Sequence, residues 1–303
     1  MRICSLVPAA TEMVFAIGLG DDVVGVTHEC DWPPEAAGRQ AVTASLVDST
    51  DLASVDIDAA VTDAMQNGGR LYAVDEVTWA EIDPDVVLTQ ELCGVCSVSR
   101  DDVDRVVEAC ALDVDVVEVS PRTLDEVMTT IVALGVRLGA DAAADELTAG
   151  MRSRLDRVRS ALVEVETRPR TFVCEWLEPP YAAGHWVPDM VEVAGGIEVA
   201  GIAGEPSYRL SWDDVRALEP DAVVLAPCGF DLDRTLDEVL PLELSANLLG
   251  TVARQESRVF AVDGNAYFSR PGPRLVDGVE LLAYLLHPEA YADPGLQWSR
   301  VRL

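Results

Sequence analysis

The sequence contains no lysine, and all 22 of its basic residues are arginines. A chain without lysine cannot use a P-loop lysine, a Schiff-base lysine or a kinase-type lysine, so the sequence excludes those classes of enzyme. The arginines stand against 53 aspartates and glutamates, which gives a formal net charge of −31. We expect no nucleic-acid partner, because nucleic acids and anionic membrane surfaces would repel a protein of this charge.

Long apolar runs are also absent. No stretch approaches the roughly 20 apolar residues that cross a bilayer, so we expect no membrane insertion. The opening residues, MRICSLVPAATEMVFAIGLG, have one arginine and no apolar run that leads to a small-residue cleavage site. They predict a strand at 3–7 and a helix at 11–17.

The seven cysteines are an odd number, and two of them form the pair Cys93-Gly-Val-Cys96. Thiols in this pattern are typical of a reducing cytosol rather than of a disulfide framework. Together with the opening residues, they predict a cytoplasmic protein. A mis-assigned start codon would instead make the protein extracytoplasmic.

Two segments of the chain resemble each other. EIDPDVVLTQELCG at 81–94 and ALEPDAVVLAPCGF at 217–230 share an acid-Pro-Asp turn, a β-branched run and a Cys-Gly pair. The two halves open on RICSL and TFVCEW, which are both apolar strands with an internal cysteine. Continuous apolar strands that alternate with helices predict parallel sheets built from βαβ units. We therefore predict an α/β fold with two Rossmann-like parallel-sheet lobes.

A helical stretch at 123–166 separates the two halves. Its second part has apolar residues three and four positions apart, as an amphipathic helix has. A helix of twenty-odd residues is a rod of roughly 35 Å, which would join the lobes rigidly. The predicted domains are an N-terminal lobe at 1–122, a helical linker at 123–166 that includes the interlobe helix, and a C-terminal lobe at 167–303.

Residues that carry chemistry gather in the loops after the predicted strands, where open α/β sheets bind their ligands. The aromatic residues of these loops suit a large, flat ligand held in a cleft between the lobes. The guanidinium groups of Arg270 and Arg274 can each donate two hydrogen bonds to oxygens of the ligand. His28 or His185 can offer an axial nitrogen to a metal inside the ligand. The predicted ligand-binding residues are His28, Glu29, Cys30, Trp32, Glu91, Trp176, Tyr181, His185, Trp186, Phe230, Tyr267, Phe268 and Arg270.

Other interpretations of these loops stay open. Cys93, Cys96 and Cys228 suit a soft metal such as zinc or iron, although a structural zinc site usually shows two close ligand pairs and this sequence shows one. With Cys30 and the histidines they would make a thiolate metal sensor or store. Alternatively, Cys93 and Cys96 form a redox dithiol. Arg270 can also lie in solvent beside the plain turn Pro271-Gly-Pro273.

Three stretches carry a family resemblance: RICSLVPAATEMVFAIGLGDDVVGVTHECDWP, AGHWVPDMVEVAGG and VDGNAYFSRPGPRLVDGVELLAYLLHPE. From Arg2 to about His287 the chain resembles the helical-backbone solute-binding proteins of ABC importers, and within them the cobalamin-binding branch. The resemblance implies two lobes joined by one long helix, no catalysis and no covalent cofactor. It also implies a cobalamin-like or other metal-chelate ligand, such as a corrinoid, haem or siderophore, and an ABC permease as partner. By position, Trp32, Trp176, Trp186 and Tyr267 would line the cleft.

The same architecture also resembles metal chelatases, which insert an ion into a tetrapyrrole. In that alternative, His28, Glu29 and His185 would deliver the metal and Glu175 would accept a proton. The chain would then be a cytosolic enzyme rather than a binding protein.

Overall fold

The computed structural model describes residues 1–47, 49, 52–67, 70–91, 100–109 and 114–302. These residues form two compact units. The first unit comprises Met1–Leu52, Asp56–Pro121 and Met128–Thr148, and the second comprises Ala53–Val55, Arg122–Val127 and Ala149–Leu303. The predicted domain boundaries at 122 and 166 stay a prediction.

A parallel sheet is the centre of the first unit. Its described strands follow the order β3-β2-β1-β6-β7, and each neighbouring pair is parallel. Strand β1 lies in the middle, and its Cys4 is in register with Val87 of β6. Both strands are buried, as continuous apolar runs predict. The bounds are β1 (Ile3–Ser5), β2 (Val23–Val26), β3 (Gln40–Ala41), β6 (Val86–Thr89) and β7 (Asp115–Glu118).

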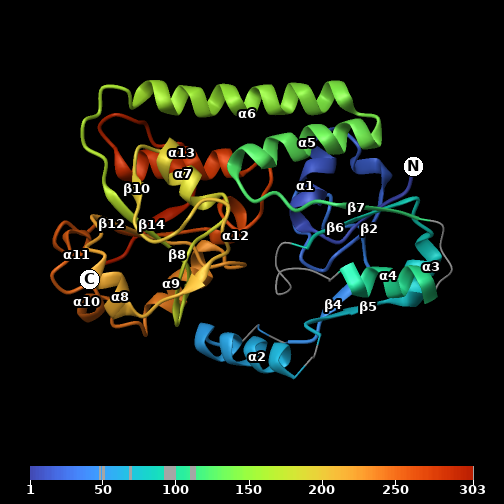
Figure 1. Cartoon of the computed structure of the whole chain (residues 1–303), viewed down its shortest axis with the longest axis horizontal. Coiled ribbons are helices and arrows are strands. Elements are labelled where there is room, and N and C mark those ends of the chain that lie inside the picture. The colour runs from blue at the N-terminus through green and yellow to red at the C-terminus, as the bar shows by residue number, and fades with distance from the viewer. Residues whose placement is uncertain (48, 50–51, 68–69, 92–99, 110–113, 303) are drawn as a thin grey trace. The chain divides into compact units, whose positions relative to one another are not determined.

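Short helices and a strand pair complete the first unit (Figure 1). Helix α1 begins at Pro8, a residue suited to the first helical turn because that turn needs no partner for its N–H. Asp75 caps α3 by accepting hydrogen bonds from the N–H groups of Val77 and Thr78. The bounds are α1 (Pro8–Ala16), η1 (Gly20–Asp22), α2 (Ser54–Gln66, whose first two residues belong to the second unit), α3 (Glu76–Ile82), α4 (Arg100–Ala109), and the antiparallel strands β4 (Thr43–Ser45) and β5 (Tyr72–Val74).

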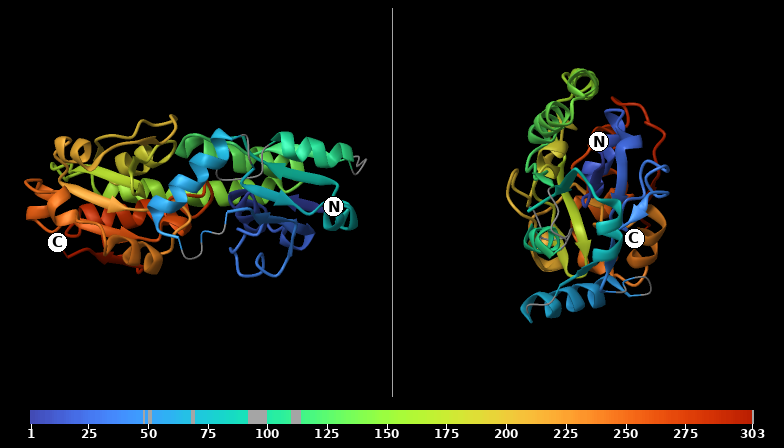
Figure 2. Two further views of the ribbon diagram at one scale, coloured as in Figure 1. Left: turned by 90° about the horizontal axis from the view of Figure 1, so that it is seen from below. Right: turned by 90° about the vertical axis from the view of Figure 1, so that its right-hand side faces the viewer.

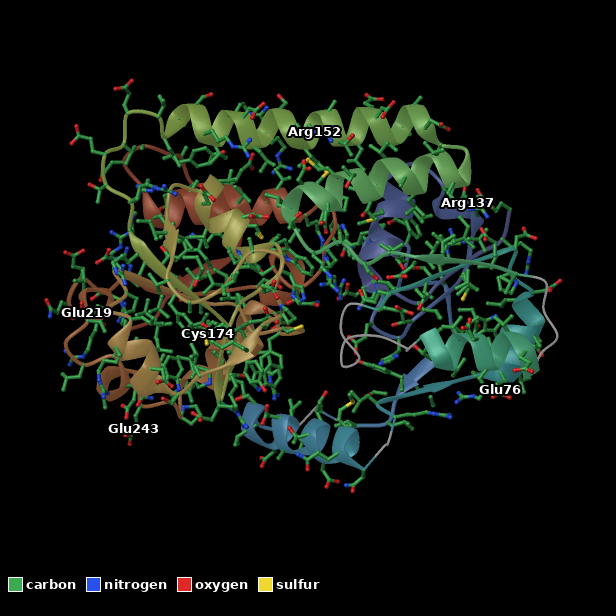
Figure 3. All side chains as sticks on the ribbon, viewed as in Figure 1. Glu76, Arg137, Arg152, Cys174, Glu219 and Glu243 are labelled. Carbon is green, nitrogen blue, oxygen red and sulfur yellow. The ribbon has the colours of Figure 1, made fainter. Side chains whose placement is uncertain are left out.

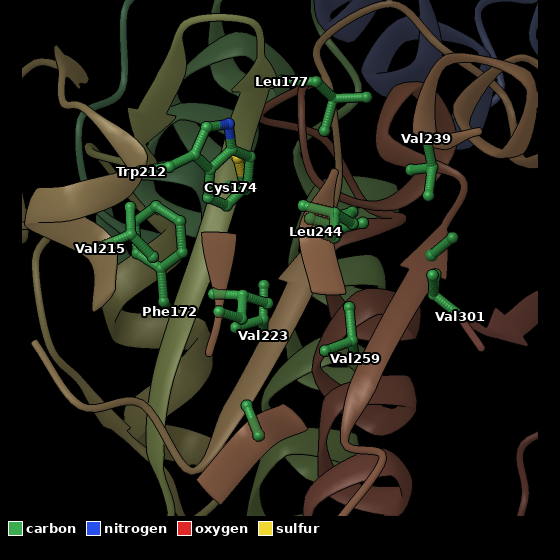
Figure 4. Close-up of a cluster of buried hydrophobic side chains, with 14 of the residues drawn as sticks. Phe172, Cys174, Leu177, Trp212, Val215, Val223, Val239, Leu244, Val259 and Val301 are labelled. Carbon is green, nitrogen blue, oxygen red and sulfur yellow. The ribbon is translucent and has the colours of Figure 1, made fainter. Parts of the chain in front are cut away.

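The second unit has a mixed sheet in the order β11-β9-β8-β12-β13-β14, with β10 paired to β8. Strands β8, β10, β12 and β13 are parallel, whereas β9, β11 and β14 run antiparallel to their neighbours. Val223 lies between Phe172 and Val259 in register, and Figure 4 shows these side chains in one buried cluster. The bounds are β8 (Arg170–Leu177), β9 (Pro180–Ala182), β10 (Ile197–Glu198), β11 (Tyr208–Arg209), β12 (Ala222–Leu225), β13 (Val259–Val262) and β14 (Trp298–Arg300).

The helices of the second unit begin at residues that suit helix starts. Ser211 and Asp214 form a capping box at α8, and Asp231 and Asp263 cap α9 and α12 through their side chains. The most deeply buried helix is α13, which packs against α7. The bounds are α7 (Val187–Val193), α8 (Trp212–Ala217), α9 (Leu232–Val239), α10 (Leu244–Asn247), α11 (Val252–Gln255), α12 (Gly264–Tyr267) and α13 (Leu275–Leu286).

The predicted helical stretch consists of two helices, α5 (Leu124–Leu138) and α6 (Asp141–Ala161). Within the first unit, the end of α5 and the beginning of α6 lie side by side in Figures 1 and 2, and Gly135 of α5 has no room for a side chain because Ala144 of α6 approaches it. Helix α6 has 21 residues, which corresponds to a length of about 32 Å, and it continues from the first unit into the second between Thr148 and Ala149.

Charged side chains lie on the outside of both units. Figure 3 shows Glu76 and Arg137 of the first unit and Arg152, Glu219 and Glu243 of the second, all of which are exposed. Within the described residues, no helix combines the length and apolar character that a membrane crossing needs. The predicted architecture of two α/β units with parallel sheets is therefore observed, whereas the antiparallel strands β9, β11 and β14 were not predicted.

Candidate functional site

In the second unit, the loops after β8, β12 and β13 meet at one edge of the sheet. These strands are parallel, so their carboxyl ends lie together. The N–H of Cys228 donates to the carbonyl of Glu175 at 2.9 Å, and the N–H of Asn265 donates to the carbonyl of Phe230 at 3.0 Å. Gly264 has no room for a side chain because the backbone of residues 226–227 approaches it. Main-chain bonds and close packing thus hold the loops after β12 and β13 to each other and to the end of β8.

An indole side chain ties the segment between β9 and α7 to the loop after β13. Trp186 is only 6% exposed, and its Nε1–H donates to the carbonyl oxygen of Phe268 at 2.7 Å. Phe268 is itself buried. Both residues were predicted to contact a ligand, and the structure places them in the packing beneath the loops. Their ligand contact stays a prediction.

A partly exposed tryptophan packs on a buried phenylalanine at the same edge. The rings of Trp176 and Phe230 have centroids 5.2 Å apart and planes tilted by 54°. The guanidinium carbon of Arg234 lies 5.0 Å from the centroid of the Phe230 ring, and Tyr181 is in register with Trp176 on β9. The indole N–H of Trp176 donates to the carbonyl of Ser54, which belongs to the same unit, at 3.2 Å. The Trp176 indole thus presents an apolar face near a guanidinium that is ion-paired with Glu238 at 2.9 Å.

His185 occupies an unusual position at the start of α7. Its backbone is left-handed with a φ of 51°, and its half-buried ring stacks on Trp186 with centroids 5.5 Å apart. Burial lowers the pKa of His185, and the positive charge of Arg122 lowers it further. The imidazole is therefore neutral at pH 7, which is the form that can donate a nitrogen lone pair to a metal.

The loop after β13 contains two further predicted residues. Tyr267 ends α12, and burial together with the nearby charge of Asp263 raises the pKa of its phenol. Arg270 is only 7% exposed, so the alternative that places it in solvent is wrong. Cys228, in the loop after β12, is a reduced and partly exposed thiol.

In the first unit, the loop after β2 is held by threonine hydroxyls. The Nδ1 atom of His28 lies 2.8 Å from the hydroxyl oxygen of Thr43, and its Nε2 atom lies 3.2 Å from a carboxylate oxygen of Glu29. The ring also packs against Tyr72, with centroids 5.6 Å apart. Both ring nitrogens thus have polar partners inside the unit. An axial role for His28 would require the Glu29 contact to break.

The remaining predicted residues of the first unit differ in burial. Cys30 is 4% exposed, and its sulfur lies 3.1 Å from the Thr11 hydroxyl, so it faces the interior. Trp32 is 45% exposed. Glu91 is exposed at the end of β6, and its N–H donates to the hydroxyl of Ser120 at 3.0 Å.

Cys93 and Cys96 lie outside the residues that the structure describes. Among the residues that it does describe, no group of three His, Cys, Asp or Glu side chains is arranged to hold a metal ion. Zinc or iron at Cys93, Cys96 and Cys228 therefore stays a prediction.

Sequence reasoning missed two polar groups near these loops. Glu198 of β10 has a carboxyl oxygen that is buried in the second unit, and a carboxylate inside the apolar run IEVAGI was a signal that could have revealed it. Thr43 holds His28, but an isolated threonine on a short strand gives no such signal. The second unit also contains a hydrogen bond from the Ser207 hydroxyl to Glu175 at 2.8 Å, which no local pattern predicts.

Comparison with known sequences gives matches along most of the chain. Residues 3–265 match the family model described as "Periplasmic binding protein". A cobalamin-binding protein of Halobacterium salinarum is 27% identical over 293 residues, which cover 94% of this chain and 69% of the relative. An uncharacterised ABC transporter substrate-binding lipoprotein of Bacillus subtilis is 26% identical over 299 residues, which cover 96% of this chain and 82% of the relative.

Comparison with solved structures confirms the predicted fold class. A periplasmic haem-binding protein of Pseudomonas aeruginosa superposes with a TM-score of 0.75 at 20% identity, over 100% of this chain and 99% of the other. At that identity the likeness concerns the fold alone.

The prediction of a cytoplasmic protein is wrong. The matching family consists of periplasmic binding proteins, and the Bacillus relative is named a lipoprotein, so the findings support the extracytoplasmic alternative. The prediction relied on the cysteine pattern and on the first 20 residues, which contain β1 and α1 of the first unit. Residues that build the fold say nothing about the compartment in which the protein works.

Proposed function

Since the chain belongs to the periplasmic binding protein family, we propose that it binds a metal-chelate solute of the cobalamin or haem type, without catalysis, for an ABC permease. The single observation that carries this proposal is the loop edge of the second unit. There the partly exposed indole of Trp176, which packs on the buried ring of Phe230, belongs to the same set of joined segments as the neutral imidazole of His185. A flat apolar ligand with a central metal needs these two features.

The names of the relatives point to the same ligand class. The Halobacterium relative is named for cobalamin, and the Pseudomonas structure is described as haem-binding. Both ligands are broad metal chelates with polar groups at their rim. Arg234 beside Phe230 is a cation at the rim of the aromatic surface, where it would meet carboxylate or amide oxygens of such a ligand.

Visible spectroscopy tests the proposal directly. Hemin and aquocobalamin are each added to the purified full chain, and the spectrum and the melting temperature are recorded. A ligand at a hundredfold excess over its Kd should stabilise the fold by about 2.7 kcal/mol. Absence of a spectral and thermal response to both probes would contradict the proposal.

Variants locate the site within the chain. His185→Ala should alter the spectrum of the bound metal, and Phe230→Leu should weaken binding without altering that spectrum. His28→Ala is the matched control, because both ring nitrogens of His28 already have partners in the first unit. If His28→Ala changes the spectrum and His185→Ala does not, the axial role belongs to the first unit. Turnover of free porphyrin plus metal ion would instead favour the chelatase alternative and overturn the non-catalytic assignment.

A further inference from the structure

Glu198 is a buried acid in the second unit that the proposed function does not use. It is the last residue of β10, a short strand paired in parallel to β8. Its Oε1 atom accepts hydrogen bonds from three consecutive N–H groups, those of Val199, Ala200 and Gly201, at 3.1, 3.0 and 3.2 Å. Its Oε2 atom is buried and has no hydrogen-bond partner among the described residues. A carboxyl group in this setting needs an explanation, since burial of a polar atom without a partner is costly.

Two physical effects oppose each other at this carboxyl group. The N–H dipoles of Val199, Ala200 and Gly201, together with that of Val173, favour the ionised form, whereas burial without a cation favours the protonated form. Burial dominates and raises the pKa of Glu198 to about 8. A neutral carboxylic acid still offers Oε1 as a carbonyl acceptor, so the three hydrogen bonds do not depend on a charge.

The segment that these bonds hold leads directly to the candidate site. Gly201 has no room for a side chain because the carbonyl of Ala183 approaches it. Further along, the N–H of His185 donates to the carbonyl of Glu205 at 2.7 Å, and the N–H of Gly204 donates to the carbonyl of His185 at 2.9 Å. The segment 199–207 therefore packs along the turn that carries His185.

That turn requires external support. A left-handed backbone is unfavourable for a residue with a side chain by about 1 kcal/mol, so His185 stays at a φ of 51° only if its neighbours hold it there. Its two main-chain hydrogen bonds both go to residues 204–205. Gly184, the residue before it, faces the backbone of residues 205–207 too closely to accept a side chain. The same segment ends at Ser207, whose hydroxyl donates to Glu175 at 2.8 Å.

We propose that Glu198 is a positioning residue, whose carboxyl group holds the segment 199–207 in the shape that fixes the His185 turn. The role of His185 as a ligand group rests on the proposed function, but the mechanical coupling from Glu198 to His185 does not. Three N–H groups donate to one oxygen, so a single side chain fixes the backbone conformation at the beginning of the segment. The two hydrogen bonds at residues 204–205 then hold the backbone of His185 against that segment.

Two substitutions at one position separate hydrogen bonding from packing. Glu198→Gln keeps an acceptor oxygen in place and resembles the protonated acid in size. Glu198→Leu fills similar space but leaves three N–H groups without an acceptor. Glu289→Gln, at an exposed position of the same unit, is the control. If Glu198→Leu does not fold, Glu198→Asp makes the same comparison, because its shorter side chain cannot reach all three N–H groups.

The first measurement needs no ligand. The chain has three histidines, so the ring signals in an NMR titration can be assigned with few variants. In Glu198→Leu, amide exchange across 199–205 should become about tenfold faster or more, and the pKa of His185 should rise toward its ordinary value as the ring gains water. The signal of His28 should not move. Glu198→Gln should restore both readouts to those of the unchanged protein.

The second measurement uses hemin as the probe. Glu198→Leu should weaken hemin binding and alter its visible spectrum in the direction that His185→Ala does, whereas Glu198→Gln should bind as the unchanged protein does. An unaltered His185 signal in Glu198→Leu would overturn the inference, and so would a failure of Glu198→Gln to rescue that signal. If the apo coupling is present and hemin has no effect on any variant, the inference stands and the proposed function fails.

Discussion

The strand-end loops of the two units are held by different sets of bonds. In the first unit, the loop after β2 has main-chain bonds from Thr27 to Ser5 and from Cys30 to Thr27, and side-chain hydroxyls add to them: Thr43 contacts His28, Thr27 accepts from Glu29, and Thr11 contacts Cys30. In the second unit, main-chain and indole bonds hold the loops, as in the bond from Cys228 to Glu175, the bond from Asn265 to Phe230 and the bond from Trp186 to Phe268.

This difference has a mechanical consequence. A hydroxyl bond to a loop is worth about 1 kcal/mol and can be lost alone. A main-chain bond between two loops is lost only if the backbone of both loops moves, and at Gly264 close packing prevents that movement. We therefore infer that the second unit presents a preformed surface to a ligand, whereas the His28 side chain of the first unit can adjust.

The largest expected effect contrasts two tryptophans, one from each unit. Trp186→Ala removes a buried indole and leaves the carbonyl of Phe268 without its donor, so it should destabilise the second unit by about 3–5 kcal/mol. Trp32→Ala removes a side chain that is 45% exposed and should cost less than about 1 kcal/mol. Denaturant unfolding followed by circular dichroism measures both. Equal losses in the two variants would remove the contrast between the units.

The next effect is a pH dependence that we expect in the second unit because of Glu198. Its pKa of about 8 in the folded protein lies above the ordinary value of 4.5, so between these values the folded state keeps a proton that the unfolded chain has released. Stability due to this group should therefore fall as the pH rises from about 5 to about 8, by an amount on the order of a few kcal/mol. Urea unfolding across this pH range measures the slope.

Glu198→Gln isolates that contribution. The lowered pKa values of His185 and His287 act in the opposite direction, since for these groups the unfolded chain binds more protons. The histidines contribute equally to the pH slope of the free energy of unfolding in the unchanged protein and in Glu198→Gln, so the difference between the two slopes is due to Glu198. Glu289→Gln should keep the slope of the unchanged protein. A slope that is identical in all three proteins would contradict the assignment.

A pair of glycine substitutions sharpens the contrast between rigid and open positions. Gly184→Ala would push a methyl group into the backbone around Glu205 and Ser207, and it should destabilise the fold by about 1–3 kcal/mol. Gly150→Ala, in the middle of α6 where nothing lies within 4 Å, should stabilise it by about 0.5–1 kcal/mol. We expect the melting temperature to fall in Gly184→Ala and to rise in Gly150→Ala. Tolerance of alanine at position 184 would show that the His185 turn is not tightly held.

The smallest expected effect concerns the hydroxyl that holds His28. Thr43→Val keeps the volume of this buried side chain but removes its contacts with the N–H and Nδ1 of His28, so it should cost about 1 kcal/mol. The ring signal of His28 in an NMR spectrum should broaden or shift. Thr62→Val, at an exposed position of α2, is the control and should leave that signal in place. An unmoved His28 signal in Thr43→Val would mean that other contacts hold the loop.

Sequence reasoning succeeded where the signal was local and repeated. The two matching segments contain β6 and β12, and each of these strands pairs in parallel with the strand that opens its half, β1 or β8. Apolar runs of four or five residues identify such strands, because a strand buried on both faces needs apolar residues at every position.

Burial of the aromatic loop residues could not be predicted in the same way. Trp186 and Phe268 were assigned to the ligand, yet they pack against each other's loops across 82 positions in the chain. Trp176 comes from similar sequence surroundings and is partly exposed. No local pattern distinguishes it from them, since what buries each side chain is a distant segment.

The amino-acid sequence by itself determined the α/β class of this protein, its acidic character and its family, because strand and helix periodicity, charge and motif order are properties of neighbouring residues. Only the tertiary structure decided that His185 sits on a left-handed turn, that Trp186 fastens two loops, and that Glu198 gathers three N–H groups. Each of these features depends on which backbone groups come within hydrogen-bond distance, and the packing of segments far apart in the chain sets those distances.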